Sequence, residues 1–335
     1  MNLTNLSTIL SSEPAYRFKQ VGHLLYKDLI DDWNKASNLP KDLKEKLAAE
    51  CPLEIKADIL KSGDRQAIKA LITLDDGSRI ETVLMRHSDK RRTICLSSQV
   101  GCPLGCSFCA TGMLGFKRNL TKEEIIEQAI FWARYLKDKH QETITNIVFM
   151  GMGEPFLNYD NVLGAIKNIN DKDGLNIGAR HISISTVGLI DGIKKLAKEK
   201  LQVNLAISLH APNDHLRSAI MSINKRYPLN KLLSTVDSYI EKTGRRVMIE
   251  YLLIKNVNDN PAQARELIEL VKKPLYLVNL ILYNETGKFQ PAETEKVKIF
   301  KDILEKAGIA VTERHRFGSE IAAACGQLAL KGKCK

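Results

Sequence analysis

Apolar residues recur with two different periods along the chain, and the change of period separates its first part from the rest. In the first 64 residues the apolar positions keep helical spacing, as Tyr16, Val21 and Leu25 do, and Pro40 is placed to open a second short helix. Segments 66–74 and 79–85 alternate instead, on either side of an Asp-Gly turn. This pattern predicts a helical domain over 1–64 and a linking β-hairpin over 65–91.

From residue 92 onward, strand-like and helix-like segments alternate. Strand patterns occur at 92–98, 145–151, 181–187, 203–210, 246–254, 276–284 and 310–318. Amphipathic helical patterns occur between most of them, at 121–138, 230–242, 260–273 and 293–308. Such alternation is typical of parallel strands joined by crossover helices. We therefore expect an α/β fold over 92–335, a partial (β/α)6-type barrel with its chemistry at the strand ends.

Composition and charge narrow the class of protein. The chain has 335 residues, 44% of them hydrophobic and 27% charged, which excludes wholesale disorder. No run approaches the ~18 apolar residues of a membrane span, and the first residues lack the basic start of a secretory signal, so we expect a cytoplasmic protein. The net charge of +11 is spread over short basic groups. It favours a polyanionic partner, although a merely solvated basic surface is an equal alternative.

Four of the seven cysteines lie within 15 residues, at Cys95, Cys102, Cys106 and Cys109. The last three follow the first barrel strand on a Gly/Pro loop, where their thiolates can turn towards one centre. One interpretation is a structural zinc site, which needs a fourth ligand such as Cys95, although that residue lies inside the strand. The other is a [4Fe–4S] cluster held by Cys102, Cys106 and Cys109, with one iron left open to a small molecule.

The CxxxCxxC spacing after the first strand of a partial barrel resembles the signature of radical S-adenosylmethionine (SAM) enzymes. The longer run from Cys95 through Cys109-Ala-Thr-Gly resembles the RlmN/Cfr family of RNA adenine methyltransferases more narrowly. The likeness extends almost end to end, because the family's motifs occur in order: MGMGEP, SISTVG, SLHAPND, INKRYPL and AACGQL.

The resemblance implies a set of cofactor contacts at successive strand ends. Taken singly, Gly-Glu-Pro is a turn, and a serine or histidine in a strand is a satisfied polar group. Polar groups at four strand ends that face one opening of the barrel are less easily explained by chance. The residues that match the family's SAM contacts are Gly153, Glu154, Ser185, Ser208, Leu209, His210 and Asn284.

The resemblance also assigns the covalent chemistry. Cys325 lies among alanines and by itself would be interpreted as an inert packing residue. It matches the family's cysteine that becomes S-methylated by one SAM. A second SAM, cleaved at the open iron, supplies the radical that activates that methyl group, which then adds to adenine. Cys95 matches the thiol that releases the adduct by forming a disulfide with Cys325. Glu81, by default a solvent-facing strand residue, aligns with a proposed general base. Cys51 and Cys334 match nothing and are interpreted as incidental.

The implied substrates are 23S rRNA, at its peptidyl transferase centre, and tRNA, at the adenosine 3′ of the anticodon. The helical domain over 1–64 is then expected to bind RNA, and a flavodoxin or ferredoxin to supply electrons to a monomer. Pro155 resembles the branch that methylates C2, whereas the spacing from Glu81 to Cys95 is closer to the C8 branch. The loop after Asn284 is shorter than in either branch. The alternatives are a C8-specific enzyme and a non-enzymatic zinc protein that binds RNA.

Overall fold

One ten-stranded sheet carries almost the whole molecule, in a computed structural model that describes residues 1 and 3–330. Its strands, in spatial order, are β1 (Ala57–Lys61), β2 (Ala67–Thr73), β3 (Arg79–Arg86), β4 (Arg92–Cys95), β7 (Asn146–Phe149), β8 (Ile182–Thr186), β9 (Asn204–Ser208), β10 (Val247–Leu253), β11 (Tyr276–Leu282) and β12 (Val311–Glu313). From β4 to β12 every neighbouring pair is parallel. The expected α/β partial barrel is therefore confirmed, with seven parallel strands.

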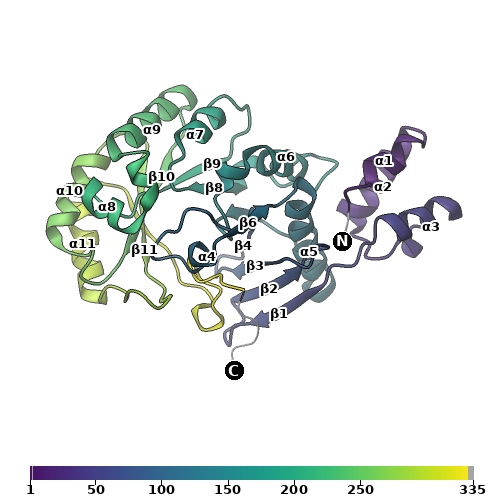
Figure 1. Cartoon of the computed structure of the whole chain (residues 1–335), viewed down its shortest axis with the longest axis horizontal. Helices are drawn as coiled ribbons and strands as arrows, with labels where there is room; N and C mark the ends of the chain where they lie inside the picture. The colour runs from purple at the N-terminus through teal and green to yellow at the C-terminus, as the bar shows by residue number, and fades with distance from the viewer. Residues whose placement is uncertain (2, 331–335) are drawn as a thin grey trace.

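Crossover helices cover the parallel strands (Figure 1). They are α5 (Lys122–His140), α6 (Tyr159–Asn170), α7 (Ile190–Leu196), α8 (Asp214–Ile220), α9 (Leu229–Thr243), α10 (Pro261–Val271) and α11 (Thr294–Lys306). The four helices that the periodicity predicts are all present. Their apolar stripes bury residues such as Ile126, Leu232 and Leu267 against the sheet. None of the described helices combines the length and apolar character that a bilayer span requires.

The hairpin β2–β3 continues the barrel sheet instead of standing apart from it. β3 pairs antiparallel with β4, with Val83 opposite Cys95. The expectation of helix throughout residues 1–64 is wrong at its end, because Ala57–Lys61 forms edge strand β1, paired antiparallel with β2. This strand lies mostly exposed, so its sequence carries little of the alternation that would reveal it. A second, two-stranded sheet of β5 (Gln99–Gly101) and β6 (Phe116–Asn119) was not expected either.

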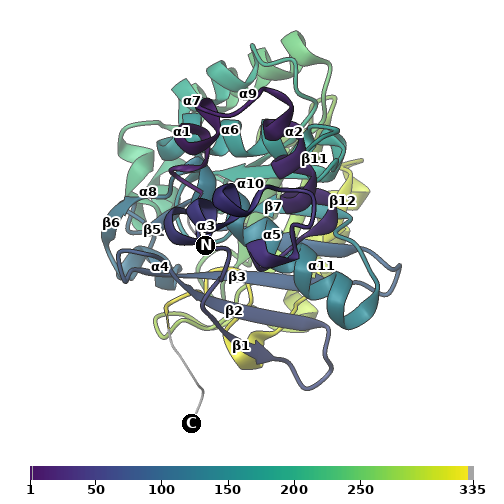
Figure 2. The same cartoon turned by 90° about the vertical axis from the view of Figure 1, so that its right-hand side faces the viewer.

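The N-terminal helices stand beside α5, away from the helices that cover β8–β11 (Figures 1 and 2). They are α1 (Leu6–Ser11), α2 (Tyr16–His23), which continues as a π-helical turn over Leu24–Asp28, and α3 (Lys41–Glu50), capped by Pro40. Arg134 of α5 holds this group in place. Its guanidinium donates to the carbonyl oxygens of Leu29 and Ile30, and to that of Leu53 at 2.8 Å.

Replacing Arg134 by Met should weaken the attachment of the N-terminal helices. Three partly buried carbonyl groups would lose their donor, which should cost about 1–3 kcal/mol in the free energy of unfolding. Chemical denaturation measures the change. The matched variant Arg91→Met, whose guanidinium pairs with Asp89 on the exposed surface, should shift stability by less than about 0.5 kcal/mol. Equal effects of the two substitutions would contradict the anchoring role.

Candidate active site

The three cysteines of the CxxxCxxC motif lie on a loop that β5 and β6 close at its base. Cys102 N–H donates to the carbonyl oxygen of Gly115 at 2.8 Å, which brings the two ends of the loop together. The approach is so close that a Cβ on Gly101, whose φ is +79°, would come within 2.0 Å of that oxygen. Only glycine fits there, so the loop's start is fixed by its sequence.

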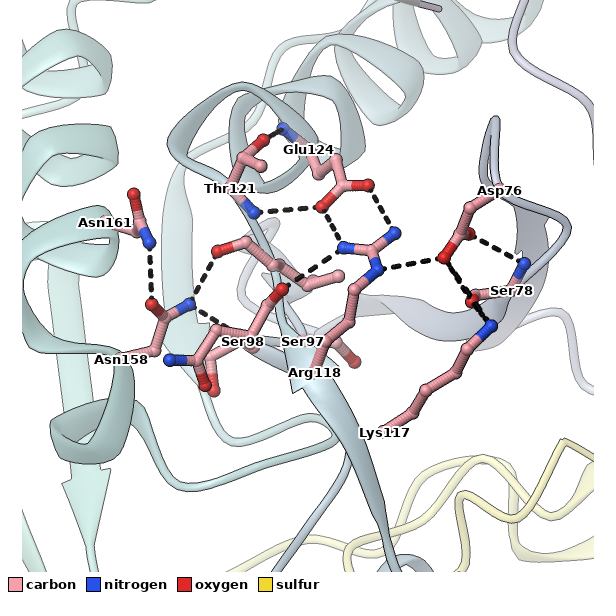
Figure 3. Close-up of polar contacts among 12 residues, drawn as sticks. Asp76, Ser78, Ser97, Ser98, Lys117, Arg118, Thr121, Glu124, Asn158 and Asn161 are labelled. Atoms are coloured by element: carbon pink, nitrogen blue, oxygen red, sulfur yellow. Dashed lines mark hydrogen bonds and ion pairs between the residues drawn. The ribbon is translucent and has the colours of Figure 1, made fainter.

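Strand β6, which follows this loop, is bonded to two neighbouring elements (Figure 3). Arg118 of β6 makes a bidentate pair with Glu124 at 2.7 and 2.8 Å, and Glu124 also closes the capping box of α5 with Thr121. The same guanidinium reaches Asp76 in the hairpin turn at 3.0 Å and is the first cause of that carboxyl's lowered pKa. The loop is therefore held in a fixed position relative to the hairpin and α5.

The thiols of Cys102, Cys106 and Cys109 suit a cluster that brings its own positive charge. Burial raises the pKa of Cys102 to about 12 and also raises those of Cys106 and Cys109. Cys109 also raises the pKa of both Cys102 and Cys106, so the three side chains belong to one neighbourhood. Buried thiols lose their protons and become thiolates when a bound metal supplies positive charge. Within the described range, no three His, Cys, Asp or Glu side chains are close enough to hold a single ion.

A cavity lies beside this loop, at the carboxyl ends of β7–β10. Seven of the residues that the sequence singled out line it: Cys109, Gly153, Glu154, Ser185, Ser208, His210 and Cys325. Gly153 has φ +100°, and a Cβ there would come within 2.6 Å of the Gln99 side chain. The positive φ and the close approach of Gln99 both require glycine at this point of the cavity wall.

Glu154 is the most unusual of these side chains, because its carboxyl group is 3% exposed. Its two oxygens accept hydrogen bonds from the backbone N–H groups of Phe156 and Val187, at 3.0 and 2.9 Å. Burial nevertheless raises its pKa to about 7. A buried carboxyl in a cavity without a salt-bridge partner favours a cationic ligand, and the ammonium group of SAM is such a cation. The donor set thus fits the cofactor.

Two charged residues at the cavity were missed by the sequence analysis. Glu250, in the middle of β10, accepts hydrogen bonds from Ser185 at 2.5 Å and from Ser208 at 3.4 Å. Arg314, directly after β12, pairs with Glu250 at 3.1 Å. A glutamate inside the otherwise apolar run 247–253 is a signal that could have drawn attention to it. Through Glu250, the two serines are oriented by one carboxylate.

His210 is buried and neutral. Its Nδ1 accepts the backbone N–H of Leu252 at 3.2 Å, and burial lowers its pKa to about 3. Leu209 differs, because its side chain is fully buried in the core, and its carbonyl oxygen accepts a hydrogen bond from Arg217. Asn284 lines a second cavity and donates to the carbonyl oxygen of Cys325 at 3.1 Å. The side chains of Leu209 and Asn284 therefore do not line the cavity that contains Glu154, which we call the cofactor cavity.

Cys95 and Cys325 line that second cavity together, and Cys325 lines the cofactor cavity as well. Both are free thiols. Burial, and then the neighbouring Cys325, raise the pKa of Cys95 to about 12, while Arg314 lowers it. Cys325 therefore lies at the junction of the two cavities. Cys95 faces Cys325, whereas the zinc hypothesis needs it beside the three loop cysteines.

Glu81 is not solvent-facing, because its side chain is fully buried and paired with Lys69 at 2.8 Å. β3 lies inside the sheet, between β2 and β4, and residues 319–330 cover it from one side. Cys51 is buried at the end of α3, where its carbonyl oxygen accepts the indole N–H of Trp33, so it belongs to the N-terminal helices. Cys334 lies outside the described residues.

Comparison with known proteins agrees with this geometry. The Radical SAM superfamily profile matches residues 96–270. The chain is 49% identical to a probable dual-specificity RNA methyltransferase RlmN of Dictyoglomus thermophilum, over 94% of this chain and 91% of that protein. A protein of the same name from Carboxydothermus hydrogenoformans is 47% identical over 96% of this chain and 94% of that protein. The chain belongs to the RlmN family of radical SAM RNA methyltransferases. A crystal structure of a radical SAM methyltransferase from Sphaerobacter thermophilus, 43% identical, superposes with a TM-score of 0.94 and covers 99% of this chain and 98% of that one.

The state of His210 can be tested through the pH dependence of stability in this RlmN-family protein. Its folded pKa lies below the unfolded value of about 6.5, so its stabilising contribution is complete above that pH and is lost on acidification. Each pH unit below 6.5 should cost about 1.4 kcal/mol. The variant His210→Gln should be less stable at neutral pH, yet its stability should fall by that much less per unit between pH 6.5 and 5. Equal slopes in urea unfolding would show that His210 is not buried as a neutral base.

Proposed function

We propose that this protein methylates C2 of adenosine in 23S rRNA, at the peptidyl transferase centre, and in tRNA, 3′ of the anticodon, with Cys325 as the methyl carrier. The observation that carries the proposal is the position of Cys325, which lines both the cofactor cavity and the cavity of Cys95. A thiol at this junction can receive a methyl group on one side and meet a resolving thiol on the other. The relatives are probable dual-specificity RNA methyltransferases, which supports RNA as the substrate.

Cys102, Cys106 and Cys109 would hold a [4Fe–4S] cluster through three of its irons. Gly153, Glu154, Ser185 and Ser208 would hold SAM beside it, with the ammonium group on Glu154 and two SAM molecules used per turnover. When bound, the cluster and SAM supply the hydrogen abstraction that adenine methylation needs. The protein's own part is to exclude water and to fix the reacting groups, which the buried cavity walls support.

The thiols and the carboxylate would complete the reaction. The Cys325 thiolate takes a methyl group from SAM by displacement, and its sulfur later carries the adenine adduct. The Cys95 thiolate then attacks the Cys325 sulfur, so that an S–S bond forms while the bond from sulfur to the methylene carbon breaks. The electron pair of that bond stays on the methylene carbon, which takes up a proton to become the methyl group of the product. Glu81 accepts the proton that leaves the ring carbon, once it is free of its present partners.

The N-terminal residues 1–64 are proposed to bind RNA. Tyr16 and Phe18 of α2 are large exposed rings, and the Arg17 guanidinium lies 4.8 Å from the Tyr16 ring centroid. Exposed rings beside basic groups are suited to stacking on unpaired bases. The net charge of +11 supports many separate phosphate contacts. We further propose a cytoplasmic monomer that receives electrons from a flavodoxin or ferredoxin.

The second candidate function is methylation of C8. We favour C2 because Pro155, which follows Glu154, resembles the C2 branch at this position. It begins a short 3-10 helix over Pro155–Asn158, where its fixed φ stiffens the loop beside the cofactor cavity. The spacing between Glu81 and Cys95 favours C8, and this observation keeps the second candidate open.

Product analysis tests both the activity and the position of the methyl group. Anaerobically reconstituted protein, SAM, a reductant and unmodified 23S rRNA or tRNA should yield 2-methyladenosine after nucleoside digestion and chromatography. Cys325→Ala should give no product, because the methyl carrier is missing. A dominant 8-methyladenosine peak would overturn the C2 assignment, and no methylated adenosine on either RNA would overturn the proposed function.

Replacing Cys95 tests its release role. Cys95→Ala should still form the adduct but not resolve it, so that protein remains covalently bound to RNA and multiple turnover falls by at least about 100-fold. Denaturing gels reveal the adduct, and peptide mass spectrometry finds it on Cys325. Cys51→Ala is the matched control, since that buried thiol lies among the N-terminal helices, and it should turn over normally. Normal turnover by Cys95→Ala would remove Cys95 from the mechanism.

A further inference from the structure

A lysine and a glutamate are buried together beneath the segment that carries Cys325. The side chains of Lys69 and Glu81 are 1% and 0% exposed, and their Nζ and Oε1 atoms lie 2.8 Å apart. They are diagonal neighbours on β2 and β3, because Lys69 pairs with Val83 and Glu81 with Leu71. Val83 in turn pairs with Cys95. The ion pair therefore lies on the face of the sheet that lines the cysteine cavity.

Each member of the pair also holds one end of the Cys325 segment. Lys69 Nζ donates to the carbonyl oxygen of Ala322 at 3.2 Å, and Glu81 Oε2 accepts the backbone N–H of Leu330 at 3.3 Å. Cys325 lies between these two residues in the chain. Ala322 and Leu330 have φ values of +50° and +58°, in the left-handed region that residues with a Cβ adopt at a cost. Both ends of the segment thus need an external hold.

We propose that Lys69 is a positioning residue, which with Glu81 forms a latch that fixes the Cys325 segment at the junction of the two cavities. Removing the lysine would leave Glu81 buried and uncompensated and would free the carbonyl group of Ala322. The consequence for methyl transfer rests on the proposed function. Both Glu81 oxygens are engaged, by Lys69 and by Leu330, so the latch must release Leu330 before Glu81 takes a proton from a substrate.

The test measures how tightly the segment is held, with the reconstituted full chain and without SAM or RNA. N-ethylmaleimide is the probe, and peptide mass spectrometry follows its reaction with Cys325, while amide hydrogen exchange is followed over 319–330. Lys69→Met should raise both the alkylation rate of Cys325 and the exchange rate of the segment by about tenfold. Lys69→Arg keeps the charge and the donors, and it should return both rates to within about threefold of the wild type.

A surface pair of equal length provides the control. Lys273 Nζ lies 2.8 Å from Asp237 on the exposed surface, so Lys273→Met should leave Cys325 reactivity unchanged. If Lys69→Met does not fold, the double variant Lys69→Met/Glu81→Gln removes the uncompensated charge and should still show fast alkylation. Wild-type rates in the folded variant, single or double, would overturn the latch. Because this assay uses no RNA, its outcome is independent of whether the wild-type protein methylates RNA.

Discussion

The position of Cys325 depends on how the open side of the sheet is bridged. β1 and β12 are the two edge strands, and residues 319–330 pass between the sheet's two ends (Figure 1, yellow). Hydrogen bonds fasten this segment to several parts of the fold: the β1–β2 turn through Gly63, β2 through Lys69, β3 through Glu81, α4 (Ala110–Met113) through Ala110 and Thr111, and the loop after β11 through Asn284. Ala110 directly follows Cys109, so one backbone hydrogen bond, to Gly326 at 2.7 Å, connects the CxxxCxxC loop to the segment that carries Cys325.

Most of the buried charged side chains around this site have specific charged or polar partners. Glu81 has Lys69, Glu250 has Arg314, and Arg217 donates to three backbone carbonyl groups and to Asn224. Each is stabilised by specific partners, because a buried charge without them would cost several kcal/mol. Glu154 differs, since its partners are two backbone N–H groups and no side-chain cation. Among the described residues that line the cofactor cavity, Glu154 is therefore the carboxyl group that lacks a positively charged partner, and it suits a cationic ligand.

The sequence predicts the parallel strands well because both faces of such strands are buried, which produces long apolar runs at 247–253 and 276–282. It fails at β1, where exposure removes the signal, and at Glu81, whose burial depends on a segment about 250 residues further along the chain. The hydrogen bond from the Asn284 amide group to Cys325 could not be predicted, because strand-end order along the chain does not tell which of two adjacent cavities a side chain lines. Pairings such as Glu250 with Arg314 join distant strands, and periodicity carries no information about them.

The proposed role of Cys325, which is to meet a cofactor, a substrate and a second thiol, requires that its segment be able to move. Apolar packing would hold residues 319–330 strongly but would resist stepwise movement, because an interior packed to crystal density does not deform gradually. Ala323 and Leu328 do pack into the core, but hydrogen bonds add separable contacts at both ends of the segment. Such contacts can be exchanged for others with little net cost, whereas the left-handed residues Ala322 and Leu330 favour departure once those contacts break. The segment thus has a defined resting position between the two cavities that Cys325 lines.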